Sequence, residues 1–209
     1  MDRSTDPPDI TVRQGAYLPH WTHADASYAV CFRLADALPQ SVLNAWRDER
    51  EDIRSLAEQQ GRALSTSEER RLKALETETM EAYLHAGSGR CHLRDPRVAA
   101  TVIEALRQFD GLRYDLFSAC VMPNHVHVVV KPFETHPLAT LLHSWKSYTA
   151  TASNRILERR GAFWQPEYYD HLIRSEEEWG HAVRYVIENP VKAGLKEWPW
   201  VYVAKGIQS

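Results

Sequence analysis

A valine-rich run at residues 121–131, Val-Met-Pro-Asn-His-Val-His-Val-Val-Val-Lys, constrains the fold more than any other part of this chain. Its alternating character predicts a β-strand, in which successive side chains point to opposite faces. His125 and His127 therefore share one face, while Val126 and Val128 face the other way, towards a core. The Pro-Asn pair just before the histidines favours a tight turn, so the strand is predicted to be the second arm of a hairpin.

Two imidazoles on one face of a stiff strand can supply two nitrogen ligands to a single divalent cation. The same spacing also arises when a half-exposed sheet face happens to carry two histidines. A third ligand and a nucleophile elsewhere in the chain would favour the metal site over this simpler explanation.

Length and composition indicate one domain with a substantial insertion, or one domain with a small appendage. The chain has 209 residues, of which 44% are hydrophobic, and seven tryptophans, which favour a packed core. We expect a cytoplasmic protein without a membrane partner, because no apolar run reaches the length of a membrane span and the N-terminus lacks a signal peptide. Three scattered cysteines, Cys31, Cys91 and Cys120, indicate reduced core thiols and disfavour a cysteine-based zinc site.

The net charge of −3 is concentrated in one segment. Residues 47–81 contain ten acidic and seven basic side chains, so the remainder of the chain is neutral, with local basic positions. The overall charge therefore neither supports nor excludes a DNA partner.

The residue pattern predicts alternating strands and helices. In chain order these are a strand at 27–34, charged helices at 41–59 and 66–85, a helix at 95–108, strands at 112–121 and 125–131, a helix at 137–159, a strand at 167–174 and a helix from 175 to Asn189, where Pro190 should stop it. If the charged pair is a helical hairpin inserted at about 41–85, the rest follows the ferredoxin-like split βαβ plan. We therefore predict an α+β fold: an antiparallel sheet with helices on one face, the histidine strand near its centre and a C-terminal helix.

The expected domain boundaries follow from the same pattern. Residues 1–26 are Pro-rich and polar and are interpreted as an N-terminal arm, residues 27–202 as the main domain, and residues 203–209 as a tail. The aromatic segment from Trp198 to Tyr202 is expected to pack back on the domain.

Two tyrosines on predicted helices differ in their surroundings. Tyr148 lies three or four residues from apolar side chains on its helix and is expected to belong to the core. Tyr185 and Asn189 are one turn apart on one face of the last helix, and His181 precedes them by a turn. Tyr185 could equally be an ordinary surface tyrosine of an amphipathic helix, and Asn189 a helix stop.

Several motifs in this order resemble the REP-associated tyrosine transposases, a bacterial branch of the single-tyrosine HUH transposases (IS200-like). They are Leu18–Trp21, Met122–His127, Trp145–Tyr148, Phe163–Arg174 and Tyr185–Leu195. The resemblance covers about 15–35 and 89–202, and leaves out the charged hairpin.

The resemblance implies an enzyme: a metal-dependent single-stranded DNA endonuclease and strand transferase that acts through a 5′-phosphotyrosine intermediate. It assigns Tyr185 as the nucleophile and His125, His127 and Asn189 as ligands of Mg²⁺ or Mn²⁺. Asparagine at 189 matches this branch and has a shorter reach than glutamine. An accessory catalytic role for His181 and simple solvation of this side chain both remain open.

The resemblance also implies a partner, the hairpins of repeated extragenic palindromes with their adjacent unpaired bases. The candidate phosphate contacts are Lys146, Arg155 and Arg174, and Tyr17 and His20 in the arm could stack on bases. Arg174 could instead form an ion pair with a neighbouring carboxylate.

Two other functions and the oligomeric state remain open at this point. One alternative is a domesticated protein that binds the hairpin and cleaves little, and another is a nuclease of the replication-initiator or relaxase type. The protein could act as a monomer or as a homodimer.

Overall fold

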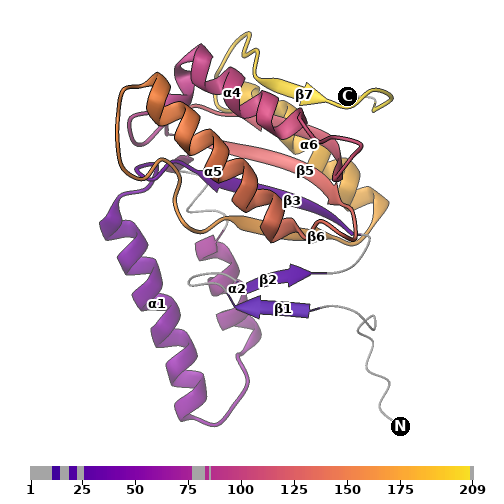
Figure 1. The fold of residues 1–209 in the computed structure, drawn as a ribbon. Coiled ribbons are helices and arrows are strands. Elements are labelled where there is room, and N and C mark those ends of the chain that lie inside the picture. Colours follow the sequence, from indigo (N-terminus) through magenta and orange to yellow (C-terminus); the bar gives the residue numbers. More distant parts are fainter. Residues whose placement is uncertain (1–10, 15–18, 23–25, 77–82, 85, 208–209) are drawn as a thin grey trace. The chain divides into compact units, whose positions relative to one another are not determined.

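The computed structural model describes residues 11–14, 19–22, 26–76, 83–84 and 86–207, and the chain divides into two compact units (Figure 1). One unit comprises Asp36–Cys91, and the other comprises the described residues before and after it. Within the described ranges, no helix combines the length and the apolar character needed to cross a bilayer.

Five strands of the larger unit form an antiparallel sheet in the order β6–β3–β5–β4–β7. They are β3 (Ser27–Arg33), β4 (Tyr114–Val121), β5 (His125–Pro132), β6 (Tyr169–Ile173) and β7 (Val201–Val203). The first four have the strand order of the split βαβ plan, with the first and third strands central, so the predicted α+β fold is confirmed. The aromatic tail does pack back, because β7 pairs with β4 as a fifth strand.

Two helices, α4 (Pro96–Arg107) and α5 (Leu138–Ile156), cover one face of this sheet (Figure 1). Val126, Val128 and Val130 of β5 point to this face and are fully buried. Burial of each valine is worth about 1.5–3 kcal/mol, so this single strand contributes several kilocalories to the layer.

An aromatic pair joins the two helices to the sheet. Trp145 of α5 packs edge-on against Tyr114 of β4, with ring centroids 5.1 Å apart, and its Nε1 donates to the Tyr114 hydroxyl (3.2 Å). That hydroxyl in turn donates to the carbonyl oxygen of Leu106 in α4 (2.8 Å). Both buried polar atoms therefore have partners, as buried Tyr and Trp require.

The prediction that Tyr148 belongs to the core is wrong, because its side chain is 62% exposed. The buried side of α5 consists of Leu138, Leu141, Leu142, Trp145, Thr149 and Ser153. Thr149 can occupy this side because its Oγ1 donates to the carbonyl oxygen of Trp145 (2.6 Å) and accepts a hydrogen bond from Trp164 Nε1 (2.9 Å). Thr149, whose hydroxyl forms its hydrogen bonds within the protein, thus takes a place on the buried side of α5 and Tyr148 is left exposed.

Helix α6 (Glu176–Lys192) lies on the opposite face of the sheet. Ser175 caps it by accepting a hydrogen bond from the backbone N–H of Glu178 (3.1 Å). Its Val183 and Val186 are buried in a small core with Cys120, Met122 and Val129 from β4, β5 and the turn between them. The sheet is therefore covered by two helices on one side and by the tyrosine-bearing helix on the other.

The prediction that Pro190 stops α6 is also wrong, since the helix continues to Lys192. Proline lacks one hydrogen bond here but is tolerated in the last turn because the end is held in another way. The N–H of Leu195 donates to the carbonyl oxygen of Pro190 (2.8 Å), and Gly194 has φ +72°, the arrangement of a glycine-terminated helix. Asn189 consequently lies within the helix and is not a freed end.

The inserted unit contains α1 (Gln40–Gln59) and α2 (Thr66–Glu76). The second predicted helix, to 85, is observed as α2 up to Glu76, residues 77–82 lie outside the described part, and Tyr83 and Leu84 are again helical. Ser65 and Glu68 form a capping box at the start of α2, with the Ser65 N–H donating to the Glu68 carboxylate (2.7 Å) and the Glu68 N–H donating to Ser65 Oγ (3.3 Å).

The predicted arm contains regular structure in its described part. The backbone of β1 (Thr11–Gln14) pairs antiparallel with β2 (Pro19–Thr22) as a separate two-stranded sheet. The assignment of Tyr17 concerns a residue outside the described ranges, and His20 is described only as a backbone position in β2.

Candidate functional site

His125 and His127 lie side by side on the face of β5 that α6 covers. Their rings are almost perpendicular, with centroids 4.7 Å apart, and both side chains are buried. His125 Nδ1 is 2.7 Å from the Oδ1 of Asn124, an amide oxygen that can only accept, so Nδ1 carries the proton. The other nitrogen of His125, Nε2, then presents a lone pair, which is the form that binds metal.

Tyr185 of α6 lies against this pair. Its ring centroid is 5.3 Å from that of His127, and the two rings are nearly perpendicular. The ammonium of Lys192 is 5.4 Å from the Tyr185 ring centroid and forms an ion pair with Glu188 (3.0 Å). The structure therefore brings together a tyrosine and two histidines that are 58 positions apart or more in the sequence.

Asn189, one turn further along α6, is fully buried. Its Oδ1 and Nδ2 have no hydrogen-bond partner among the described residues. Leaving a buried amide without partners costs about 1–3 kcal/mol, so native proteins rarely do so without a functional reason.

From the path of α6 we infer that Asn189 lies near the level of His125. Trp179 packs on Phe117 near the middle of the sheet (5.3 Å between centroids), and Tyr185 packs on His127 (5.3 Å). The helix thus runs towards the beginning of β5. Four helical residues advance about 6 Å and two strand residues about 6.6 Å, so the step from Tyr185 to Asn189 matches the step from His127 to His125.

The residues present fit a divalent cation held by two imidazoles and an amide oxygen. No group of three or more His, Cys, Asp or Glu gathers within the described ranges, so a cation bound by the two histidines would take its third protein ligand from the Asn189 amide. Cys120 is the register partner of His127 on β4, and burial raises the pKa of its thiol to about 12. Imidazole nitrogen and carbonyl oxygen both suit Mn²⁺ and its neighbours, and the oxygen suits Mg²⁺.

Sequence reasoning missed Arg33, which pairs directly with His125 across β3 and β5 and so projects to the same face. Its side chain is only 5% exposed, and its Nε donates to Gln165 Oε1 (2.8 Å). Burial lowers the pKa of this guanidinium, and the nearby Glu167 partly opposes that shift, but an arginine remains cationic. The alternation of Arg33 with Val30 and Phe32 placed it away from the core, but only the strand register brings it beside His125.

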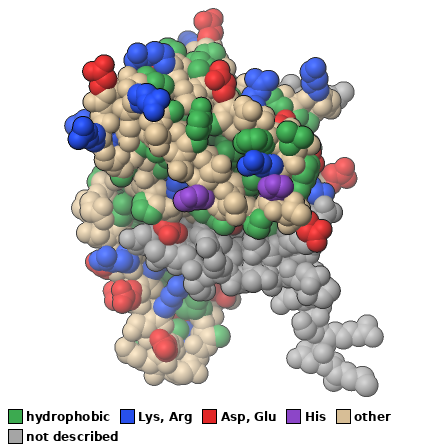
Figure 2. All heavy atoms as spheres, viewed as in Figure 1, with side chains coloured by type: hydrophobic (Ala, Val, Ile, Leu, Met, Phe, Trp, Pro, Cys, Tyr) green, Lys and Arg blue, Asp and Glu red, His purple; other side chains and the backbone are tan. Residues whose placement is uncertain are grey.

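The candidate DNA contacts are spread over the molecule. Arg155 and Arg174 are exposed at the ends of α5 and β6, and the backbone N–H of Arg174 donates to the Glu178 carboxylate (2.6 Å). Lys146 is half-buried and lines a hollow on the α5 side. On the face shown in Figure 2, lysine and arginine side chains are scattered and form no continuous stripe, so DNA binding to that face would depend on local contacts.

The side chain of His181 lies on the surface and does not point into the candidate site. Its side chain is 68% exposed, and its Nε2 lies 3.9 Å from the Glu177 carboxylate one turn earlier. This favours the interpretation that it is a solvated surface residue.

Together the antiparallel sheet, the buried histidine pair and the facing tyrosine have the features expected of a single-tyrosine transposase. Residues 93–189 match the family model described as "Transposase IS200 like", and this range includes His125, His127, Tyr185 and Asn189. The resemblance inferred from the motifs is thereby confirmed, and the chain carries an IS200-like transposase region.

Individual relatives are more distant. A Haemophilus influenzae protein provisionally named a REP-associated tyrosine transposase is 24% identical over 101 residues, which cover 42% of this chain and 57% of that protein. A solved structure of a REP-associated tyrosine transposase bound to a REP hairpin matches 90% of this chain and 80% of its own, with a TM-score of 0.47 and 15% identity. A structure from Deinococcus radiodurans R1, provisionally described as a transposase, matches 85% of this chain and 95% of its own, with a TM-score of 0.31 and 16% identity.

Proposed function

We propose that this protein is a metal-dependent endonuclease and strand transferase that acts on single-stranded DNA beside palindromic hairpins. The observation that carries the proposal is the contact between the Tyr185 and His127 rings, together with the buried, unsatisfied amide of Asn189 one turn later. Tyr185 packs on the edge of the small core, and its contact with His127 and its position one turn from a buried amide without partners support a role in phosphoryl transfer.

In the proposed reaction Tyr185 Oη attacks the scissile phosphorus in line. A new bond forms between Oη and the 5′-phosphate, the P–O3′ bond breaks, and the 3′-oxygen leaves as a hydroxyl after taking up a proton. Because an unperturbed tyrosine has a pKa of about 10, its proton has to be removed as attack proceeds. The phosphotyrosine ester conserves the energy of the broken bond, so a second 3′-hydroxyl can reverse the step and join a different strand.

His125 and His127 would hold the cation through ring nitrogens, and Asn189 through Oδ1. When bound, Mg²⁺ or Mn²⁺ would polarise a non-bridging phosphate oxygen and stabilise the charge that develops in the transition state. The ligand set is neutral, so affinity for the cation should rise strongly when the DNA phosphate adds negative charge. The Arg33 guanidinium beside His125 adds a further fixed positive charge to this end of the sheet.

The DNA partner is proposed by analogy with the relative whose structure is described as bound to a REP hairpin. Lys146, Arg155 and Arg174 are proposed phosphate contacts, and Tyr17 and His20 are proposed to meet unpaired bases. The lysine and the two arginines are separate from one another on the surface, so each should contribute a modest, salt-dependent increment to the binding free energy.

The test uses single-stranded hairpin DNA carrying the host's palindromes, labelled at either end and incubated with Mn²⁺ or with EDTA. We expect cleavage only with Mn²⁺, leaving protein covalently attached to the 5′ end, and no adduct from Tyr185→Phe. Tyr148→Phe is the matched control, because Tyr148 is an exposed helical tyrosine on the other face of the sheet. Tight hairpin binding in Mn²⁺ without an adduct would refute the enzyme and favour a domesticated binding protein.

A further inference from the structure

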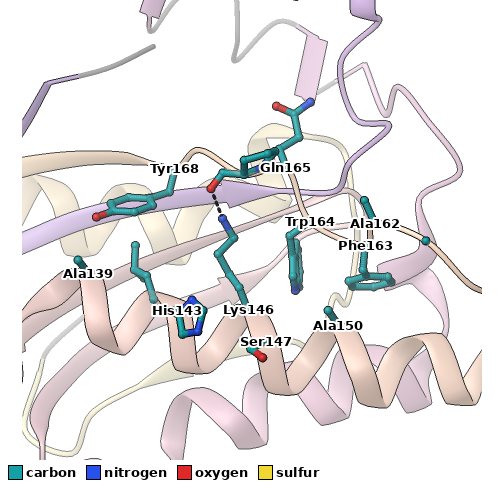
Figure 3. Close-up of a pocket in the computed structure, with 13 residues that line it drawn as sticks. Ala139, His143, Lys146, Ser147, Ala150, Ala162, Phe163, Trp164, Gln165 and Tyr168 are labelled. Carbon is teal, nitrogen blue, oxygen red and sulfur yellow. Dashed lines mark hydrogen bonds between the residues drawn. The ribbon is translucent and has the colours of Figure 1, made fainter. Parts of the chain in front are cut away.

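A hollow of about 570 Å³ opens between α5 and residues 161–168, on the side of the sheet away from Tyr185 (Figure 3). Its walls include four aromatic or imidazole rings and small side chains of α5. The residues used here are His143, Lys146, Ser147, Ala150, Trp164 and Tyr168. Volumes of this order accommodate a small organic ligand, such as one nucleotide.

Lys146 supplies the charge in this hollow. Its ammonium donates to the carbonyl oxygen of Pro166 (2.6 Å) and lies 5.9 Å from the centroid of the Tyr168 ring. An ammonium has three donors, and a carbonyl is a neutral partner, so the positive charge is not cancelled by this bond. None of the described residues lining the hollow is Asp or Glu. Burial lowers the pKa of Lys146 to about 8, and the nearby Glu167 carboxylate, which does not line the hollow, opposes only part of that shift. A negatively charged ligand in the hollow would neutralise the Lys146 ammonium and raise its pKa again.

The position of the hollow relates it to the candidate active site. Pro166 directly follows Gln165, whose side chain accepts a hydrogen bond from Arg33, and Arg33 pairs with His125. The hollow and the histidine pair therefore flank the same end of the sheet, one on each face. A single strand passing over that end could contact both.

We propose that the hollow binds one unpaired nucleotide next to the cleaved phosphate, with a phosphate oxygen on Lys146 and the base against Tyr168 and His143. This rests on the proposed function, and extends it by assigning a place outside the catalytic cluster where the unpaired flank is held. Stacking of a base on an aromatic side chain tolerates any base, so the hollow would contribute affinity more than sequence readout.

The experiment measures binding by fluorescence anisotropy to two labelled hairpins, one with an unpaired flank and one blunt. Lys146→Met removes the ammonium and keeps its stem, and Ala150→Phe fills the hollow. The controls are Lys196→Met, an exposed lysine away from the hollow, and Ser144→Phe, an exposed position of α5 that does not line it. Thermal melts establish that each variant is folded.

We expect both hollow variants to weaken binding of the flanked hairpin about tenfold and to leave the blunt hairpin almost unchanged. The controls should lose less than about twofold on either DNA, the size expected from one exposed charge. Equal losses on both hairpins, or no loss on either, would overturn the proposal.

A calorimetric titration with a deoxynucleoside monophosphate separates this inference from the proposed function. If the wild type bound no hairpin, the proposed DNA partner would be wrong. Binding of the mononucleotide that is abolished by Lys146→Met would then still support a nucleotide site in the hollow. Absence of mononucleotide binding would refute that site. A third outcome combines two results: the free mononucleotide competes fully with the flanked hairpin, and the hollow variants weaken binding of both hairpins equally. The hollow would then be a site for free nucleotides, and its proposed role in DNA binding would be wrong.

Discussion

Replacing Asn189 by leucine should stabilise the metal-free protein while removing its response to metal. Leucine has the same branching of heavy atoms as asparagine but no polar atoms, and Asn189 is fully buried with both amide atoms unsatisfied. Relief of that penalty is worth about 1–3 kcal/mol. Leucine also has the higher helix propensity, by a few tenths of a kcal/mol.

For a chain of this size, about 1 kcal/mol corresponds to about 2–4 °C in the melting temperature. In EDTA we therefore expect Asn189→Leu to melt roughly 3–9 °C above the wild type. Asn44→Leu is the control for an asparagine-to-leucine change on an exposed helix face. It also removes an exposed hydrogen bond from Gln40 (3.0 Å), and it should shift the melting temperature by only about 1–2 °C.

Addition of Mn²⁺ should then raise the melting temperature of the wild type and reduce or reverse the advantage of the variant. A cation at a hundred times its dissociation constant stabilises the folded state by about 2.7 kcal/mol, which only the wild type should gain. Differential scanning calorimetry with and without Mn²⁺ measures both effects. The reasoning would be refuted if Asn189→Leu were less stable than the wild type in EDTA, or if Mn²⁺ raised both melting temperatures equally.

Three further outcomes are expected. Arg33→Met should reduce cleavage at least tenfold with a smaller effect on hairpin affinity, because Arg33 lies beside His125 and its side chain is buried; an equal loss of binding and cleavage in a gel assay would contradict this. The pKa of Lys146 is lowered from 10.5 to about 8 in the folded state, so the unfolded chain binds more protons between these values and this residue makes unfolding free energy rise from pH 8 to 10.5. Urea titrations should show that the unfolding free energy rises with pH more steeply in the wild type than in Lys146→Met. A wild-type rise no steeper than that of Lys146→Met would count against the lowered pKa. Gly89→Ala should destabilise the inserted unit by about 1–3 kcal/mol, because Gly89 has φ +84° and a Cβ there would lie 2.5 Å from the carbonyl oxygen of Asp36; an unchanged urea midpoint would contradict this.

The sheet and its order were predictable because periodicity and short-range spacing determine them. The alternation around His125 and His127 placed both on one face of a central strand, and the four-residue spacing of Tyr185 and Asn189 placed those two on one face of a helix. Both relations hold in the structure, and they define most of the candidate site.

The errors come from interactions that a linear pattern does not contain. Tyr148 is exposed because Thr149 satisfies its hydroxyl inside the helix layer and takes the buried position. Pro190 does not end α6, because the turn after it closes through Gly194 and Leu195. Arg33 could not be assigned to the site without the register of β3 against β5, which depends on contacts between residues about ninety positions apart.

The two halves of the candidate site differ in how they are attached. His125 and His127 lie on a strand that is hydrogen-bonded on both sides, so their backbone amides should exchange with solvent only when the whole sheet opens. Helix α6 is attached to the sheet by side-chain packing and not by a ladder of backbone hydrogen bonds. Local opening of α6 should therefore cost less free energy than opening of the sheet. The distance between Tyr185 and the two histidines therefore depends on how α6 packs against the sheet, and amide exchange in α6 would report it.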